Sequence, residues 1–498
     1  MTSQDLYVTT SIPYVNGAPH LGHALELVQV DALARHRRRR GGAARVQSGT
    51  DDHALKNVSA AAASGVGVAD LVRTNGDRFV ELAAALGVRT DEFLRTSSDS
   101  RHEAGVAALW EACRAAGDLY EKEYAGRYCA GCEQFYAPDE LVDGRCAEHG
   151  TEPELVTETN WFFRLSAYRE RILDLVLRGE VVVAPAQRRN EVLGFLRGEV
   201  HDLSVSRPAS RAGGWGIPVP GDPEQVVYVW FDALTNYLTG LGYGSADDAA
   251  YRRWWRDDVE RTHVVGKGIV RFHAVFWVAF LLSAGVPVPS RVLVHDYLTV
   301  DGAKIAKSGA QAADPASLVE AYGADAVRWW LLREPAPVGT CDFTEDRLVA
   351  AADRDLANCI GNLASRTVAL AARRPAAGPA TAYDVELAER VDGLAAQVDA
   401  ALARYDLRAA CQAVVGVAEA GNRYVEAEAP WVLAKAAEAG DTEAGARFDA
   451  VIATLLHLCR TVADELEPFV PDGAARLRAQ LAAVGSRAEP AFPRLAAR

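Results

Sequence analysis

Three observations predict the fold class, an α/β protein with a doubly wound, Rossmann-like parallel sheet, an inserted domain and a following all-α helical bundle. A strand, a tight turn and a helix follow one another near the N-terminus. A cysteine cluster among Gly/Pro-rich turns interrupts this pattern, and an Ala-rich region of helical periodicity follows it. The chain of 498 residues is too long for one core, so we expect two to four domains.

The first α/β unit is predicted from local pattern. Residues 6–10 are rich in β-formers and indicate a buried strand, while Asn16-Gly17 indicates a turn. Apolar residues at helical spacing predict a helix from about His20. Residues 45–50 predict a second strand that ends in the polar run 51–53. Ligands of doubly wound sheets bind at the carboxyl ends of the strands, so both strand ends are candidate site positions.

The domain boundaries follow from changes of pattern along the chain. Residues 226–230 and 292–295 are predicted to be later strands of the same sheet. We therefore expect a catalytic domain split into 1–115 and 226–350, an inserted domain at 116–225, and a helical bundle at 351–498. The bundle is indicated by apolar residues that step by three or four positions, as one helix face requires: Leu387, Val391, Leu394, Val398, Leu402 and Tyr405.

The net charge of −14, from 53 basic and 67 acidic residues, argues against non-specific binding to nucleic acid. The basic run 35–40 could still form a local patch. Alternatively it is the solvated end of a helix that stops at Gly41, because cations favour a helix C-terminus.

The eight cysteines predict a reducing compartment, because three cluster, five are scattered, and no disulfide framework is visible. The N-terminus lacks a basic segment that leads into an apolar stretch, so no secretory signal is predicted. The longest apolar run, near 274–288, is shorter than the roughly 18 residues of a membrane span and predicts a buried helix. We expect a cytoplasmic protein without a membrane partner.

Four residues of the insert have the spacing of zinc ligands. Cys129 and Cys132 form one ligand-x-x-ligand pair, and Cys146 and His149 form a second pair after an interval of 13 residues. Three thiolates and one imidazole complete a closed tetrahedral site, so the sequence predicts a structural zinc knuckle. The alternative is four unrelated residues in a loop-rich insert.

Two distant motifs suggest that the chain binds a polyphosphate. His20-Leu21-Gly22-His23 opens the first helix, where the helix dipole favours anions, and Lys304-Ile305-Ala306-Lys307-Ser308 lies well past the middle. Together they could hold the triphosphate of ATP. Alternatively, the histidines cap or pack and the lysines are solvated.

These motifs, in this order around a cysteine knuckle, resemble those of class I aminoacyl-tRNA synthetases, and most closely the methionyl-tRNA synthetase family. The resemblance runs from about residue 6 to residue 435 and is strongest at 9–23, 228–237 and 266–273. It implies a two-step reaction. The methionine carboxylate attacks the α-phosphate of ATP, which Mg²⁺ accompanies, and the adenylate then acylates a ribose hydroxyl at the tRNA 3′ end.

The resemblance also implies roles for individual residues. Phosphate-binding, catalytic residues would be His20, His23, Lys304 and Lys307, with Gly22 and Ser308 also contacting ATP. Asp51 would hold the substrate ammonium through a charge-assisted hydrogen bond. The pocket for the methionine side chain would comprise Ile12, Tyr14, Trp230, Ala233, Leu234, Tyr237, Ile269 and His273. The tRNA anticodon would be read by Asn362, Arg366 and Trp431.

Each of these roles has a structural alternative. Asp51 could cap the next helix, and the aromatic stripe could be ordinary core. Asn362 and Arg366 could be a surface pair at i,i+4 spacing, with Trp431 in the core.

The departures from the family pattern cluster around the nucleotide site. Gly268 stands in place of an Asp expected to contact the ribose, and Asp296 follows His295 in place of a Gly. Further departures are Ala54, Ile305, Ala306 and Gly309. They put adenosine recognition and loop closure in question. The sequence therefore leaves two alternatives to a methionine–tRNA ligase: a paralog that transfers the activated amino acid to a small molecule, and a non-catalytic protein that binds tRNA or a partner. No dimerisation module is recognisable, so a monomer is expected.

Overall fold

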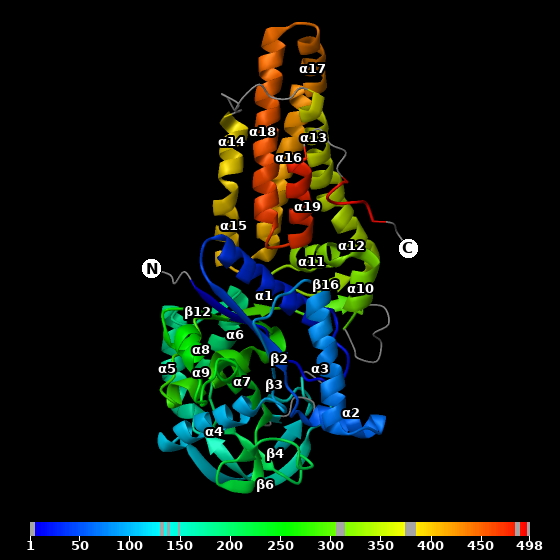
Figure 1. Cartoon of the computed structure of the whole chain (residues 1–498). Helices are drawn as coiled ribbons and strands as arrows, with labels where there is room; N and C mark the ends of the chain where they lie inside the picture. The colour runs from blue at the N-terminus through cyan, green and yellow to red at the C-terminus, as the bar shows by residue number, and fades with distance from the viewer. Residues whose placement is uncertain are drawn as a thin grey trace. The chain divides into compact units, whose positions relative to one another are not determined.

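The computed structural model describes residues 5–129, 134–136, 140–147, 150–304, 314–373, 385–483 and 489–495 (Figure 1). The chain forms two compact units. The first unit comprises Met1–Val30, Arg37–Ala84 and Val88–Asp296, and the second comprises Asp31–His36, Ala85–Gly87 and Tyr297–Arg498.

A six-stranded sheet organises the first unit. Its order is β3-β2-β1-β12-β13-β7, and every neighbouring pair is parallel. Parallel strands end at the same edge, so the carboxyl ends of the central strands meet there. The strands are β1 (Leu6–Thr9), β2 (Ala44–Thr50), β3 (Glu92–Arg95), β7 (Val182–Ala184), β12 (Glu260–Gly266) and β13 (Arg291–His295).

Helices connect these strands along the chain, and one of them, α1, contributes Asp31–His36 to the second unit. Trp110 is fully buried in the core of the first unit, with its ring centroid 5.5 Å from Phe231 and 6.1 Å from Trp161. The helices are α1 (Leu21–Arg39), α2 (Leu55–Ser64), α3 (Val68–Ala85), α4 (Ser100–Ala115), α5 (Leu165–Arg178), α6 (Ala186–Arg197), α7 (Val229–Thr239), α8 (Ala249–Tyr251) and α9 (Trp277–Ser283).

Two smaller antiparallel sheets belong to the same unit. One has the order β5-β4-β6-β8, from β4 (Leu119–Cys129), β5 (Gln134–Tyr136), β6 (Glu154–Phe163) and β8 (Leu203–Ser204). The other has the order β10-β11-β9, from β9 (Ser206–Pro208), β10 (Pro218–Val219) and β11 (Asp222–Val227).

One predicted strand of the main sheet is wrong. Residues 226–230 were expected to form it, but β11 ends at Val227 in the small sheet and α7 begins at Val229. Nearly every residue of α7 is buried, so its apolar residues show no one-sided period that would distinguish a helix from a strand. The main sheet instead contains β12, which pairs with both β1 and β13. The prediction for residues 292–295 is confirmed by β13.

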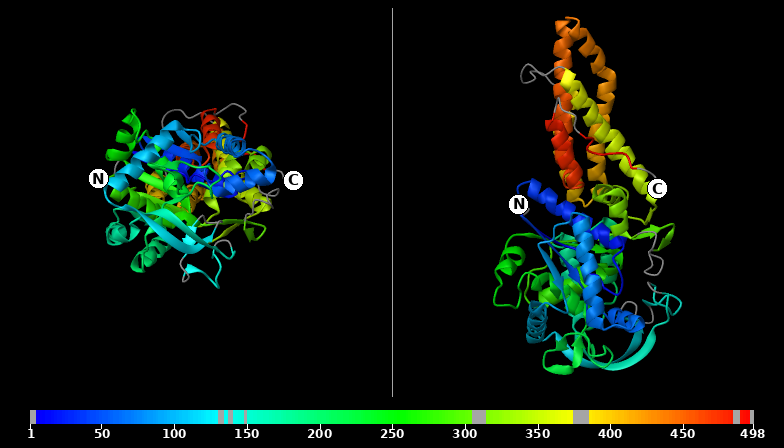
Figure 2. Two further views of the ribbon diagram at one scale, coloured as in Figure 1. Left: turned by 90° about the horizontal axis from the view of Figure 1, so that it is seen from below. Right: turned by 45° about the vertical axis from the view of Figure 1, so that its right-hand side comes forward.

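The second unit is mainly helical, as predicted (Figure 2). It contains one three-stranded sheet in its described part, β15-β14-β16, from β14 (Leu298–Val300), β15 (Ala303–Lys304) and β16 (Cys341–Phe343). The helices are α10 (Pro315–Tyr322), α11 (Ala324–Arg333), α12 (Glu345–Ala351), α13 (Asn362–Arg373), α14 (Val385–Asp392), α15 (Leu394–Ala403), α16 (Leu407–Glu428), α17 (Pro430–Glu438), α18 (Thr442–Leu466) and α19 (Pro471–Ala482).

The six apolar residues predicted to share a helix face are all buried. They lie on two short helices rather than one, because α14 ends at Asp392 and α15 begins after Gly393, and Tyr405 follows α15. The apolar run near 274–288 contains the buried helix α9, as expected. Across the described part of the chain, no helix is both long and apolar enough to cross a membrane.

Candidate active site

The two histidines of the first motif lie at the start of α1, with their rings stacked 3.7 Å apart. Nδ1 of His23 accepts from the His20 amide at 3.0 Å, and Nδ1 of His20 accepts from the Gly22 amide at 3.1 Å. A β-carbon at Gly22 would lie 3.0 Å from Cε1 of His20, so a side chain there would crowd the ring. The histidines do contact backbone amides at the helix start, and a neutral ring in this geometry carries its proton on Nε2.

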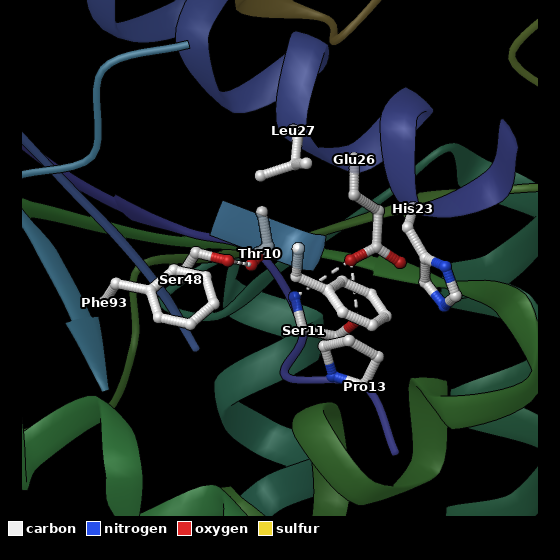
Figure 3. Close-up of a pocket in the computed structure, with 9 residues that line it drawn as sticks. Thr10, Ser11, Pro13, His23, Glu26, Leu27, Ser48 and Phe93 are labelled. Carbon is white, nitrogen blue, oxygen red and sulfur yellow. Dashed lines mark hydrogen bonds between the residues drawn. The ribbon is translucent and has the colours of Figure 1, made fainter. Parts of the chain in front are cut away.

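A buried carboxylate lies one turn further along α1. Oε2 of Glu26 accepts from the amide and the hydroxyl of Ser11, at 3.0 and 2.6 Å (Figure 3). Oε1 of Glu26 lies 3.0 Å from Nε2 of His295, which ends β13. Glu26 thus connects the segment after β1 to the end of β13. His23 and Glu26 also line a crevice with an empty volume of about 280 Å³, which is open to solvent.

The surroundings of His295 favour its charged form, because an acceptor faces each ring nitrogen. Its Nδ1 lies 2.9 Å from the carbonyl oxygen of Asp296, an acceptor that requires a proton on this nitrogen. Burial alone would lower the pKa of His295, but the hydrogen bond and charge of Glu26, with Asp296, raise it above the ordinary value. Asp296, one of the departures from the family pattern, is itself buried and forms an ion pair with Arg188 of α6.

The structure brings several of the residues predicted for the side-chain pocket close together. The Tyr14 and Trp230 rings lie 6.4 Å apart, and the Trp230 and His273 rings lie 6.4 Å apart. The Tyr237 hydroxyl lies 2.8 Å from Nε2 of His273. Ala233 and Leu234 are buried on the same helix as Trp230 and Tyr237.

The state of His273 is fixed by its neighbours. Nδ1 lies 2.9 Å from the Ile269 carbonyl and must donate, so Nε2 of the neutral ring accepts from the Tyr237 hydroxyl. Burial lowers the pKa of His273 to about 4, which keeps the ring neutral. Burial also raises the pKa of Tyr237, so its hydroxyl keeps the proton.

Asp51 lies beside Tyr14, directly after β2. Its amide donates to the Pro13 carbonyl at 2.9 Å, and it forms a parallel bridge with Tyr14. The N-cap residue of α2 is Ala54, not Asp51. Ile12 lies close to the end of β2, because a β-carbon placed at Gly49 would be 3.1 Å from the Cγ2 methyl group of Ile12.

The lysine motif is described only at its beginning. Lys304 ends β15, opposite Thr299 of β14. Lys307 and Ser308 lie outside the described residues, as do the departures Ile305, Ala306 and Gly309. The lysine roles therefore stay predictions.

Two of the four predicted zinc ligands are described. Cys129 and Cys146 are both buried thiols and share a neighbour, Thr151. Its hydroxyl lies 3.9 Å from Sγ of Cys129, and its carbonyl accepts from the Cys146 amide at 2.9 Å. Cys132 and His149 lie outside the described residues. Among the residues that are described, no group of three ligands could hold a metal.

The predicted anticodon residues lie in the second unit. Asn362 is exposed at the start of α13, and the Arg366 guanidinium lies 5.9 Å from the Trp431 ring centroid. Trp431 is 43% exposed, which disagrees with the alternative that it belongs to the core. The basic run that begins at Arg35 lies in the last turns of α1, and four of its side chains pair with carboxylates rather than being simply solvated: Arg35 with Asp31, His36 with Asp399, Arg37 with Glu260 and Arg38 with Asp91.

Several side chains of the site had no role assigned from the sequence. Phe272 stacks on Trp230 with the ring centroids 3.7 Å apart, and Glu26 and His295 form the pair described above. Another such pair joins His53 to Asp232 at 2.7 Å. Phe272 and Asp232 lie inside motifs that the sequence analysis recognised, whereas Glu26 lies outside them.

A parallel sheet with histidines at the helix after its first strand, and an aromatic cluster beside Asp51, is the arrangement of the catalytic domain of a class I aminoacyl-tRNA synthetase. The family described as tRNA synthetases class I (M) matches residues 6–148 and 131–368. The family described as the anticodon binding domain of methionyl tRNA ligase matches residues 374–493. The chain belongs to the methionyl-tRNA synthetase family, which confirms the resemblance found in the sequence.

Individual relatives agree over nearly the whole chain. A methionine–tRNA ligase from Mycobacterium bovis is 39% identical over 97% of this chain and 95% of its own length. One from Brucella suis is 38% identical over 96% of this chain and 92% of its own length. The crystal structure of Mycobacterium tuberculosis methionyl-tRNA synthetase bound by methionyl-adenylate superposes with a TM-score of 0.89. It shares 37% identity and covers 98% of this chain and 100% of that chain.

Proposed function

We propose that this chain is a methionine–tRNA ligase, which activates methionine with ATP and transfers it to the 3′ end of tRNA. The observation that carries the proposal is the pocket of Tyr14, Trp230 and His273 beside the buried carboxylate Asp51, in a chain of this family. The small-molecule paralog is not favoured, because the relatives described above are named methionine–tRNA ligases and match this chain over nearly their whole length.

The histidine pair is proposed to bind the ATP phosphates. Each Nδ1 accepts a backbone amide proton, so each neutral ring carries a donor proton on Nε2. Such donors at a helix N-terminus suit the spread negative charge of phosphoryl transfer. The same contacts that cap α1 therefore also set the tautomer that a phosphate-binding histidine needs.

Asp51 is proposed to bind the ammonium group of methionine. The carboxylate of methionine then remains free to attack the α-phosphate of ATP. The amino-acid side chain would enter the aromatic pocket, where rings surround a polarizable thioether favourably. Because His273 and Tyr237 satisfy each other, the pocket presents a neutral lining.

Lys304 and Lys307 are proposed to neutralise the departing pyrophosphate, with Mg²⁺ bound to ATP. The pair Cys129 and Cys146, gathered at Thr151, fits half of a thiolate-rich structural zinc site, which Cys132 and His149 would complete. Zinc there would stabilise the insert and supply no chemistry to the reaction.

Arg366 and Trp431 are proposed to contact the tRNA anticodon, with Asn362 on the same helix as Arg366. An exposed Trp can stack on a splayed base, and Asn and Arg can bond base edges. A monomer in a reducing cytoplasm remains our expectation, as does the division into domains at 115, 225 and 350.

Two assays test the function. Methionine-dependent exchange of pyrophosphate into ATP measures activation, and charging of purified methionine tRNA measures transfer. We expect both activities. Exchange without charging would support the small-molecule paralog, and the absence of both would support a non-catalytic binding protein.

A further inference from the structure

A buried charge network connects the Asp51 segment to the pocket helix α7. Oδ2 of Asp232 lies 2.7 Å from Nδ1 of His53, and Oδ1 lies 2.5 Å from Nε2 of His102 on α4. The other nitrogen of His102, Nδ1, lies 2.8 Å from the Thr239 hydroxyl at the end of α7. The side chains of Asp232 and His102 are 1% and 0% exposed, and that of His53 is 10% exposed.

The network keeps a charged carboxylate inside the core. Burial would raise the pKa of Asp232, but the two imidazoles lower it well below its ordinary value. Burial would lower the pKa of His53, but Asp232 raises it above its ordinary value. A buried charge that loses its partner is strongly destabilised, so Asp232 holds His53 firmly in place.

His53 lies two residues after Asp51, and the chain between them is fixed on several sides. The Asn57 side-chain amide donates to the carbonyls of Asp51 and Asp52, at 2.9 and 2.8 Å. The Trp215 indole also donates to the Asp52 carbonyl, at 2.8 Å. The hydrogen bond from His53 to Asp232 therefore connects α7, the helix that carries the proposed pocket residues, to the firmly held segment 51–53.

Asp232 belongs to the same helix as four of the proposed pocket residues, Trp230, Ala233, Leu234 and Tyr237. We propose that Asp232 and His53 are positioning residues that fix the ammonium-binding Asp51 relative to the methionine side-chain pocket. This inference rests on the proposed roles of Asp51 and the pocket. The amino acid needs both contacts at once, so a small displacement of either one weakens its binding, whereas ATP does not depend on this spacing.

The choice of substitutes follows from the atoms involved. An asparagine at position 53 places its side-chain NH₂ near the Nδ1 position of the imidazole and can keep the hydrogen bond to Asp232. A glutamine places it near Nε2, one bond too far. The test therefore uses His53→Gln as the disrupting variant, His53→Asn as the conservative variant and His53→Ala as the full deletion.

The experiment measures KM for methionine and for ATP by pyrophosphate exchange, together with thermal unfolding. We expect His53→Gln and His53→Ala to raise the methionine KM about 10- to 100-fold, because this is the effect expected when one charged hydrogen bond is lost. The ATP KM and kcat should change less than about threefold, and His53→Asn should restore most of the affinity. His201→Gln, at a side chain that is 62% exposed, is the matched control and should behave as the parent.

Two results would overturn the inference. One is a methionine KM that stays at the parent value in folded His53→Gln, whatever its melting temperature. The other is an ATP KM that rises as much as the methionine KM. If His53→Ala does not fold, the comparison of Gln with Asn still decides. Asp51→Ala separates the two proposals, because an unchanged methionine KM in that variant would refute the role of Asp51 itself.

Discussion

Replacing Glu26 with glutamine should change how the stability of the first unit depends on pH. Glu26 accepts two hydrogen bonds from Ser11 and faces the protonated Nε2 of His295. The glutamine carbonyl can keep both bonds to Ser11. Its NH₂ group would then face Nε2, which has to release its proton to accept this bond. The variant therefore replaces a charged pair by a neutral hydrogen bond of the same shape.

The size of the effect follows from the partners. Hydrogen bonds that involve charged groups contribute about 1.5–3 kcal/mol and neutral ones about 0.5–1.5 kcal/mol, so the parent should be more stable by about 1–2 kcal/mol in acid. The pKa of His295 is raised in the folded protein. The stabilisation is therefore fully present below the unfolded pKa of about 6.5 and is lost as the pH rises through the raised folded pKa. Above that pH, the lone pair of Nε2 faces the Glu26 carboxylate, and the advantage of the parent disappears.

The assay is denaturant unfolding of the parent and of Glu26→Gln at several pH values between 6 and 9. The free energy of unfolding is taken from the unfolding transition whose midpoint differs between the two proteins. His295 C2–H chemical shifts in the parent report the titration directly. Glu81→Gln, an exposed carboxylate on α3, is the control and should match the parent at every pH. A stability difference that is constant across this range, or that grows with pH, would refute a protonated His295 held by Glu26.

Three further predictions concern other parts of the chain. Lys307→Ala should lower the rate of pyrophosphate exchange by orders of magnitude with amino-acid binding nearly intact, and an equally active variant would show that the loop is not catalytic. Arg328 is fully buried, donates to the carbonyls of Pro468 and Phe469, and pairs with Asp31 at 2.7 Å. Arg328→Met should therefore lower the free energy of unfolding by about 3–5 kcal/mol in a denaturant titration, and a loss below about 1 kcal/mol would contradict this account. Metal analysis of protein purified under reducing conditions should find one zinc per chain, and its removal by a chelator should lower the melting temperature; protein without zinc would refute the knuckle.

The parts of the fold that the sequence predicted are those encoded by local pattern. The strands at 6–9 and 44–50 flank a turn and the helix α1, and each signal lies within a few residues of the element it predicts. The run 226–230 failed because α7 is buried on nearly all sides, so its composition suits a strand and a helix equally. Family motifs, rather than periodicity, led to Trp230 and Tyr237, and the structure brings these residues close to His273.

The rest of the site depends on contacts between residues that are remote in sequence. Asp232 is 179 residues from His53 and 130 from His102, and no local pattern reveals that one carboxylate serves both rings. Protonation depends on the same kind of contact. The neutral form of His273 is favoured because the ring donates to a carbonyl and accepts from a phenol, whereas the charged form of His295 is favoured because an acceptor faces each of its nitrogens. Both residues are histidines near the ends of parallel strands or in the helix that follows, so residue type alone could not have distinguished them.

The role of Asp296, a departure from the family pattern, also follows from its contacts: its carbonyl accepts from His295 and its side chain pairs with Arg188. A chain with glycine at position 296 would keep the carbonyl contact and lose the ion pair, which leaves Arg188 with Glu191. The substitution therefore changes the charge balance beside His295 while it preserves the hydrogen bond that fixes the ring.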